Sequence, residues 1–312
     1  MIINLLLFLI MLFLLIKSAE YSITYSSRLA RSLRMSEFLI SFFIVAVISV
    51  FPETTISIVS SLKGVPELGL GTLIGSNITD LTLVLGIVVL LSKRDGLTIQ
   101  SKILRKDFVY LILLLLPVLL GFDAHFSRID GLILIISCII FFISLYIEGS
   151  RFKKTDHQNK YIKNSFLLLI SLAFLLTAAY YTVEFGVKFA EDINFPPLLI
   201  GLVVFSIGVC LPEMLFSIKA VKRNHNTLAL GDLLGTVIID ATLIIGILAL
   251  INPFDFDPLL IYIAGSFMFI SGLLVIIFIK TGRQITKREA IYLIGFYILY
   301  LIVELSARNF LL

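Results

Sequence analysis

The chain has 312 residues, of which 59% are hydrophobic and only 15% are charged. A soluble protein carries roughly 45–50% apolar and about 25% charged residues, so this composition excludes an ordinary soluble enzyme and a disordered chain. The net charge of +4 comes without the basic, aromatic-rich surface that nucleic-acid binding requires. The mean hydropathy of +1.07 is typical of a helical protein with several membrane spans.

A bilayer core of about 30 Å requires roughly 20 apolar residues per helix. The first apolar run lacks a basic leader and a small-residue cleavage site, so we interpret it as a membrane helix. In chain order, the sequence predicts ten spans at 2–30, 36–62, 67–91, 104–121, 128–147, 164–190, 195–222, 227–251, 258–279 and 287–306. Glycine, proline and acidic residues interrupt the second, third, seventh and eighth of these spans.

The distribution of basic residues supports this number of spans. Of the 25 Lys and Arg residues, 21 fall in connections on one side of the expected membrane and four on the other. These four are Lys63, Arg128, Lys188 and Arg308. Because cytoplasmic connections are enriched in Lys and Arg, we expect both termini to lie outside the cytoplasm.

The chain contains an internal repeat. Residues 37–91 and 197–251 align at a constant offset of 160 positions, with 18 of 55 identical and no gap. The matched residues include the pairs Pro52-Glu53 and Pro212-Glu213, Gly71 and Gly231, Gly75 and Gly235, and Asp80 and Asp240. Five expected helices separate the two copies, so the second copy is inverted in the membrane. Inverted repeats with interrupted helices are typical of secondary transporters, which bind their substrate near the midplane.

The expected fold is therefore an all-α membrane protein with ten transmembrane helices in two inverted five-helix repeats. The first repeat covers 1–147 and the second covers 164–312. A short, basic cytoplasmic linker, 148–163, joins them and is too short to fold into a regulatory domain.

Four carboxylates fall near the middle of expected spans: Glu53, Asp80, Glu213 and Asp240. A charged group at the bilayer centre costs at least about 2.5–3.5 kcal/mol. No Lys or Arg lies at the same depth in these four helices, so protons or cations have to neutralise them. Oxygen ligands suit hard cations such as calcium, magnesium and sodium.

Each glutamate follows a proline. A proline inside a helix removes one backbone hydrogen bond, so main-chain oxygens near Ile48-Ser49 and Gly208-Val209 become available to a cation. Ser76 and Thr236 add hydroxyl oxygens next to the second glycine of each glycine pair. The sequence thus predicts a cation site that is built twice.

These motifs resemble those of the sodium/calcium exchanger family, within the cation/calcium antiporter superfamily. That family carries a G-[ST]-S-x-P-E stretch and a G-N-x-x-G-S-N-x-x-[ND] stretch in each of two repeats. The first corresponds here to 48–53 and 208–213, and the second to 71–80 and 231–240. The resemblance implies a transporter, not an enzyme, that works by alternating-access antiport as the first and sixth helices slide.

The resemblance also implies a set of ion ligands. Calcium would be held mainly by Glu53 and Glu213, completed by carbonyls near Ser49 and Val209. Sodium would occupy surrounding sites that use hydroxyl, amide and carbonyl oxygens, with Asp80 and Asp240 flanking the centre. The positions expected for these surrounding sites are Ala46, Ser76, Asn77, Ser206 and Thr236.

The chain departs from the family motif at three ligand positions. The motif serine, a sodium ligand in the family, is Val50 in one copy and Cys210 in the other, and Asn77 is matched by Val237. Valine offers no ligand atom, and a neutral thiol binds hard sodium poorly. Aspartate also occupies the last motif position in both copies. These changes leave open whether sodium or protons drive transport, and whether the cargo is calcium or another divalent cation such as magnesium.

Two other readings stay open at this point. An intramembrane aspartyl protease would need two membrane aspartates that share a proton, but the sequence lacks the motifs of such enzymes. A cation-binding protein without transport activity is the other, motivated by Val50 and Val237. Asp232 is ambiguous, because the helix dipole alone could explain an acid near a helix start. We expect a protein of the plasma or inner membrane that acts as a monomer without a cofactor.

Overall fold

The computed structural model describes residues 2–33, 37–62, 66–93, 96–98, 107–149, 161–192, 206–282 and 284–309. These residues are almost entirely helical. They divide into two compact units, Met1–Pro52 with Tyr146–Gly235 and Glu53–Leu145 with Thr236–Leu312. Each unit therefore combines segments from both halves of the sequence.

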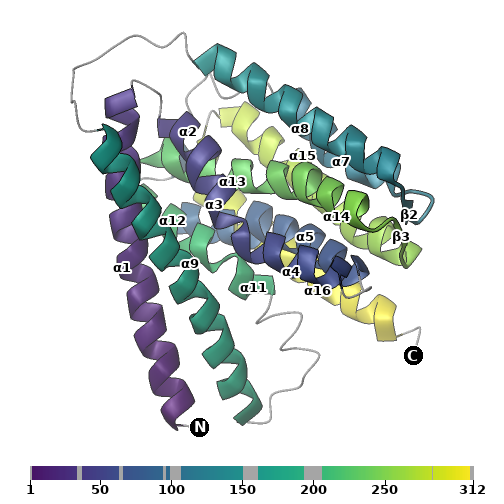
Figure 1. Cartoon of the computed structure of the whole chain (residues 1–312), viewed down its shortest axis with the longest axis horizontal. Helices are drawn as coiled ribbons and strands as arrows, with labels where there is room; N and C mark the ends of the chain where they lie inside the picture. Colours follow the sequence, from purple (N-terminus) through teal and green to yellow (C-terminus); the bar gives the residue numbers. More distant parts are fainter. Residues whose placement is uncertain are drawn as a thin grey trace. The chain divides into compact units, whose positions relative to one another are not determined.

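The first unit contains the two longest helices of the described chain. Its helices are α1 (Ile2–Leu33), α2 (Glu37–Ile40), the π-helix η1 (Ser41–Val45), α3 (Ala46–Ser49), α9 (Tyr161–Asp192), α11 (Ser206–Val209), α12 (Leu211–Lys222) and the first part of α13 (Asn226–Ile238). Helices α1 and α9 lie side by side (Figure 1). Leu15, Ala19 and Ile23, spaced four apart on one face of α1, are buried. Ser22 donates a hydrogen bond of 3.1 Å to Ser171 of α9.

The second unit contains the remaining helices and four short strands. Its elements are α4 (Phe51–Leu62), α5 (Pro66–Thr79), η2 (Asp80–Val84), α6 (Leu85–Leu90), β1 (Gly96–Thr98), α7 (Asp107–Leu120), β2 (His125–Phe126), α8 (Arg128–Gly149), η5 (Ile239–Ile244), α14 (Ile245–Ile251), β3 (Phe254–Asp255), η6 (Leu260–Gly265), α15 (Ser266–Gly282), β4 (Gln284–Thr286) and α16 (Lys287–Asn309). Strand β1 pairs with β4 and β2 with β3, both antiparallel. These pairings join the loops around α7 and α8 to those around α15.

Close glycine contacts bring α8 and α14 together within the second unit. A Cβ atom added to Gly131 would lie 2.7 Å from the carbonyl oxygen of Gly246, and one added to Gly246 would lie 2.8 Å from that of Gly131. Neither position has room for a side chain. Small residues that allow such backbone contact are common between membrane helices.

Eight described helical stretches are long and apolar enough to cross a membrane. They are Ile2–Leu29, Phe38–Ile58, Gly69–Leu90, Arg128–Ile147, Tyr161–Ala178, Asn226–Ile251, Ile261–Gly282 and Lys287–Ala307. Each coincides with an expected span. The expected span 104–121 corresponds to α7, whose 14 residues are fewer than the roughly 20 that a straight crossing needs. Part of the expected span 195–222 and most of the linker 148–163 lie outside the described residues.

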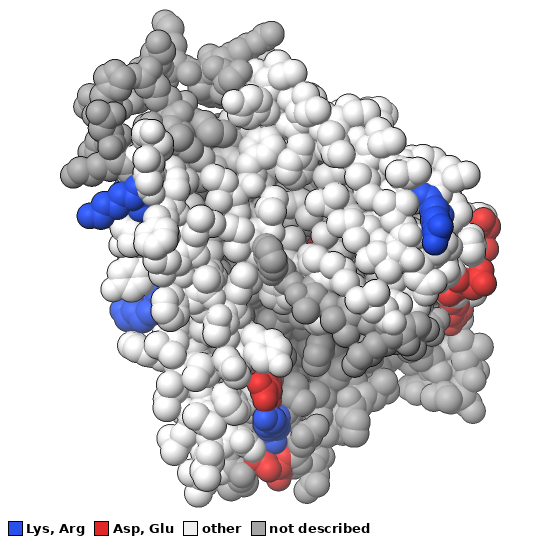
Figure 2. Space-filling model, viewed as in Figure 1, with Lys and Arg blue, Asp and Glu red and all other residues white. Residues whose placement is uncertain are grey.

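Large apolar side chains cover the outer faces of these helices. Phe108, Ile129 and Ile162 are 70%, 69% and 70% exposed. Figure 2 shows a wide surface without charged residues, with the Lys, Arg, Asp and Glu side chains gathered at a few places. Apolar surface on this scale is unfavourable in water and favourable against lipid, which supports the prediction of a membrane protein.

Candidate cation-binding site

A break in the helix precedes each Pro-Glu pair. Helix α3 ends at Ser49 and α4 begins at Phe51, so Val50 stands between them with φ −74° and ψ 3°. In the second copy Cys210 stands between α11 and α12 with φ −82° and ψ 3°. The two breaks lie at positions 160 residues apart. The interruption that the prolines predict is therefore confirmed in both copies.

All four predicted carboxylates are buried. Glu53, Asp80 and Asp240 belong to the second unit, whereas Glu213 belongs to the first, and the side chain of each is fully shielded from solvent. Burial of a carboxylate is costly unless a hydrogen bond, a cation or a proton compensates the charge. Buried carboxyl groups at related positions in both copies are the pattern that the repeat predicts.

The second unit brings Ser76 and Asp240 together. The Ser76 hydroxyl lies 3.4 Å from Oδ2 of Asp240 and also 3.0 Å from the carbonyl oxygen of Leu73. The side-chain amide of Asn77, in contrast, lies 3.5 Å from the sulfur of Met268. The Ser76 hydroxyl thus places a further oxygen atom beside the Asp240 carboxyl. The amide nitrogen of Asn77 lies next to the Met268 sulfur instead.

Both aspartates lie in π-helices, which the sequence analysis missed. Asp80 is the first residue of η2, and Asp240 is the second residue of η5. A π-helical turn inserts one extra residue into the helix, changes the directions of nearby side chains and is frequent at functional sites. The π-helices η1 and η6 contain no acidic residue, so this geometry alone does not mark a site, but it recurs at the two repeat-related aspartates.

The first unit brings together Ser49, Glu213 and Asp232. The Ser49 hydroxyl lies 3.4 Å from Oδ1 of Asp232 and 3.2 Å from the carbonyl oxygen of Ala46, and it is close to the Glu213 carboxyl. The two carboxyl groups are near enough for their charges to repel each other. Ala46 and Val209, two further predicted positions, are buried in this unit. The side chain of Ser206 lies outside the described part of the chain, and Thr236, on α13, is buried in the second unit.

Repeat-related serines connect consecutive helices. Ser57 on α4 lies 3.5 Å from the carbonyl oxygen of Gly69 on α5, and Ser217 on α12 lies 3.4 Å from that of Ala229 on α13. Both hydroxyls donate to the following helix rather than to their own. They hold each Pro-Glu helix against the glycine-rich helix of the same copy.

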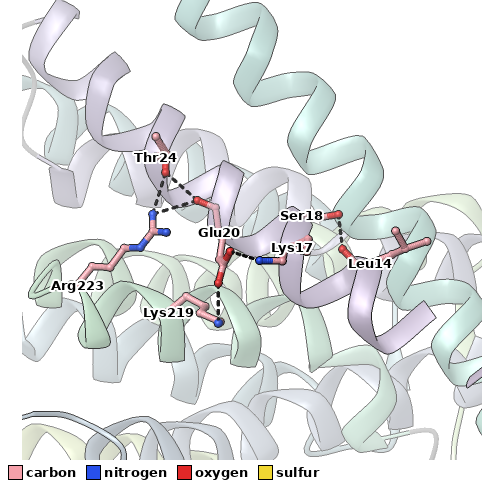
Figure 3. A network of polar contacts seen from close by, with 7 residues as sticks. All are labelled: Leu14, Lys17, Ser18, Glu20, Thr24, Lys219 and Arg223. Carbon is pink, nitrogen blue, oxygen red and sulfur yellow. Dashed lines mark hydrogen bonds and ion pairs between the residues drawn. The ribbon is translucent and has the colours of Figure 1, made fainter. Parts of the chain in front are cut away.

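A polar network fixes the helix that carries Glu213. Figure 3 shows Glu20 of α1 between Lys17 and Lys219, at 3.2 Å and 2.9 Å. The Arg223 guanidinium donates to the Thr24 hydroxyl at 2.8 Å. Helix α12 is thus attached to α1 by charged and polar contacts, a link that helical periodicity alone did not reveal.

Comparisons with known proteins identify the family of the chain. The family model described as sodium/calcium exchanger protein matches residues 3–147 and 163–305. The chain is 25% identical to the sodium/calcium exchanger MaX1 of Methanosarcina acetivorans, across 96% of this chain and 98% of the relative. It is 28% identical to the inner membrane protein YrbG of Escherichia coli, across 80% of each chain.

Solved structures of the same family are also similar to this protein. A structure of the sodium-calcium exchanger NCX_Mj, soaked with Na+ and Sr2+, has a TM-score of 0.85 and 26% sequence identity to this protein, covering 96% of this chain and 98% of that chain. The prediction of a transporter is confirmed, and the protease alternative is wrong. The protein is a multi-pass, all-helical transporter of the cell membrane, and the chain belongs to the sodium/calcium exchanger family.

Proposed function

We propose that the protein exchanges calcium for sodium across the cell membrane by alternating access. The observation that carries this proposal is the pair of repeat-related helix breaks, at Val50 and Cys210, each three residues before a fully buried glutamate. Because the chain belongs to the exchanger family, we interpret these repeated breaks and glutamates as the site that binds the transported ions.

In the proposed site, Glu53 and Glu213 hold the calcium ion, and main-chain oxygens of Ser49 and Val209 complete its coordination. Pro52 and Pro212 support this arrangement, because a proline cannot donate to the carbonyl four residues earlier. Those carbonyls belong to Ile48 and Gly208, directly before Ser49 and Val209. Asp80 and Asp240 flank the centre. Sodium binds at oxygens of the surrounding residues, which are Ala46, Ser76, Asn77, Ser206 and Thr236.

The proposed topology has ten transmembrane helices in two inverted five-helix repeats, 1–147 and 164–312, with the linker 148–163 in the cytoplasm. Both termini lie outside, and the protein works as a monomer. Sliding of α1 and α9 switches access to the site. Their long contact within one unit supports this role, since two helices packed in this way can move together.

Proton coupling is a second candidate. Cys210, fully buried at the helix break, stands where the family has a sodium-binding serine, and Val50 stands at the same place in the first copy. Neither side chain is a good ligand for sodium. Asp80 and Asp240 provide two carboxylates that can carry protons. The same site could then exchange calcium, or another divalent cation such as magnesium, for protons.

The test is calcium uptake by purified protein in liposomes. One set of liposomes carries an outward sodium gradient at constant pH, and a second set carries an outward proton gradient without sodium. We expect uptake in the first set. Glu53→Gln and Glu213→Gln should each reduce it by at least about 100-fold, because loss of a charged ligand from a buried site costs about 3 kcal/mol or more.

Glu304→Gln is the matched control, since Glu304 is also a buried carboxyl, only 5% exposed, but lies outside the proposed site. Uptake only in the second set would replace sodium by protons as the driving ion. Wild-type rates in both glutamate variants would refute the assigned site. Absence of uptake under both gradients would contradict calcium exchange itself.

A further inference from the structure

Asp232 is a buried acid for which the helix dipole gives no explanation. Helix α13 begins at Asn226, so Asp232 lies in its second turn, and the first turn contains no acidic residue. The stabilising effect of a helix N-terminus on an acid is confined to about one turn. The position of Asp232 therefore needs a different physical reason.

The surroundings of Asp232 and Glu213 leave carboxylate oxygens unsatisfied. Both side chains are fully buried. Oδ2 of Asp232 and both carboxylate oxygens of Glu213 have no hydrogen-bond partner among the described residues, and neither group forms an ion pair there. Ser49 contributes one hydroxyl, which lies 3.4 Å from Oδ1 of Asp232 and has the Ala46 carbonyl oxygen as a second acceptor at 3.2 Å. Two adjacent, buried carboxylates and a hydroxyl are the ligands that a hard divalent cation prefers.

Packing between α13 and the segment α2–η1–α3 holds this group in place. A Cβ atom on Gly231 would lie 2.6 Å from the carbonyl oxygen of Phe38, so the residue next to Asp232 is in backbone contact with the neighbouring segment. The Ser41 hydroxyl donates to the carbonyl oxygen of Leu228 at 2.6 Å. The carboxyl of Asp232 is thus positioned by backbone contacts and not by a flexible loop.

The combination of the Asp232 carboxyl and the Ser49 hydroxyl has no counterpart at the repeat-related positions. The position related to Asp232 is Thr72, and the position related to Ser49 is Val209. A purely structural hydrogen bond would not require a charge at this place, since threonine fills it in the other copy. The extra carboxylate is specific to the unit that contains Glu213.

We propose that Asp232 is a direct ligand of the transported divalent cation, which the first unit binds through Asp232, Glu213 and the Ser49 hydroxyl. Two neighbouring carboxylates in a low-dielectric site need a compensating positive charge, and a bound divalent cation supplies it. This inference deepens the proposed function and rests on it for the identity of the cargo, while the binding site itself can be tested without transport.

The experiment measures equilibrium binding of radioactive calcium to the purified full-length protein, together with its melting temperature with and without calcium. Asp232→Asn should lower calcium affinity by about tenfold or more, since a bond to a charged group contributes about 1.5–3 kcal/mol. Ser49→Ala keeps both charges and should lower the affinity about threefold. Glu304→Gln serves as the control and should bind calcium like the wild type.

Melting temperatures separate a ligand from a structural residue. Without calcium, Asp232→Asn should melt at the same temperature as the wild type or higher, because it removes an uncompensated buried charge. With calcium, its stabilisation should be smaller than that of the wild type. A lower melting temperature without calcium, together with unchanged affinity, would assign Asp232 a structural role and overturn the proposal.

The same variants in the liposome assay separate this site from the proposed function. Calcium binding that depends on Asp232, without sodium- or proton-driven uptake by the wild type, would support the site and refute the exchange. Uptake that depends on Glu213, with wild-type affinity and rate in both Asp232→Asn and Ser49→Ala, would support the exchange and refute the site.

Discussion

The contact between Gly235 and Ala46 leads to a quantitative prediction about packing in the first unit. A Cβ atom on Gly235 would lie 2.6 Å from the Cβ of Ala46, about 1 Å closer than the optimal separation of two carbon atoms. It would also lie 3.2 Å from the carbonyl oxygen of Phe42. Neither neighbour is the end of a flexible side chain, so Gly235→Ala has to move one backbone away from the other.

Two opposing effects determine how much Gly235→Ala changes the stability of the protein. Overpacking of this kind costs about 1–3 kcal/mol, whereas alanine in a helix is favoured over glycine by about 1 kcal/mol. The net destabilisation expected for Gly235→Ala is therefore up to about 2 kcal/mol. Gly295→Ala on α16 is the matched control, because a Cβ atom there would meet nothing within 4 Å. Only helix propensity acts at Gly295, and that variant should be slightly more stable than the wild type.

The assay is thermal unfolding of the purified variants in detergent, where 1 kcal/mol corresponds to about 2 °C for a chain of this size. A double-mutant cycle tests whether the contact between Gly235 and Ala46 causes the loss of stability. Ala46→Gly removes the opposing methyl group, so Ala46→Gly with Gly235→Ala should recover most of the lost stability. Equal effects of alanine at Gly235 and Gly295, or no recovery in the double variant, would show that the close contact does not limit packing.

The departures from the family motif give two further predictions. Val50→Ser combined with Cys210→Ser restores two hydroxyl ligands and should lower the sodium concentration for half-maximal calcium uptake by about threefold or more; an unchanged sodium dependence would show that these positions do not face the ion. Asp80→Asn removes a flanking charge and should alter the sodium or proton dependence more than the calcium affinity, measured by the same uptake and binding assays. A collapse of calcium affinity with unchanged coupling would contradict that division of roles.

The large features of the fold were predictable because they depend on local or repeated signals. The prolines at Pro52 and Pro212 each predict a broken helix, and the observed breaks at Val50 and Cys210 follow. Apolar length predicts the spans, and eight described stretches coincide with them. The two-stranded pairings were not predictable, since strands of two or three residues contain too few positions for an alternating pattern.

The site was predictable in its residues but not in its arrangement. The π-helical turns at Asp80 and Asp240 leave hydrophobic periodicity nearly unchanged, so the sequence gives no sign of them. Asp232 illustrates the other difficulty. Its importance depends on its distance from Ser49, 183 residues earlier in the chain, and on the exclusion of solvent from both. Neither property is present in a local motif.

The two copies of the repeat share the same backbone features. They differ in the side chains that offer oxygen ligands. Helix breaks, π-helical aspartates and the serines that join consecutive helices recur at an offset of 160 residues. Ser49 and Thr72 of the first copy, in contrast, correspond to Val209 and Asp232 of the second. Inverted repeats with related backbones let one central site open to either side of the membrane in turn, and the unmatched ligands belong to that site in both conformations. In the proposed mechanism, the fold thus provides the movement, and the few unmatched residues determine which cation is carried.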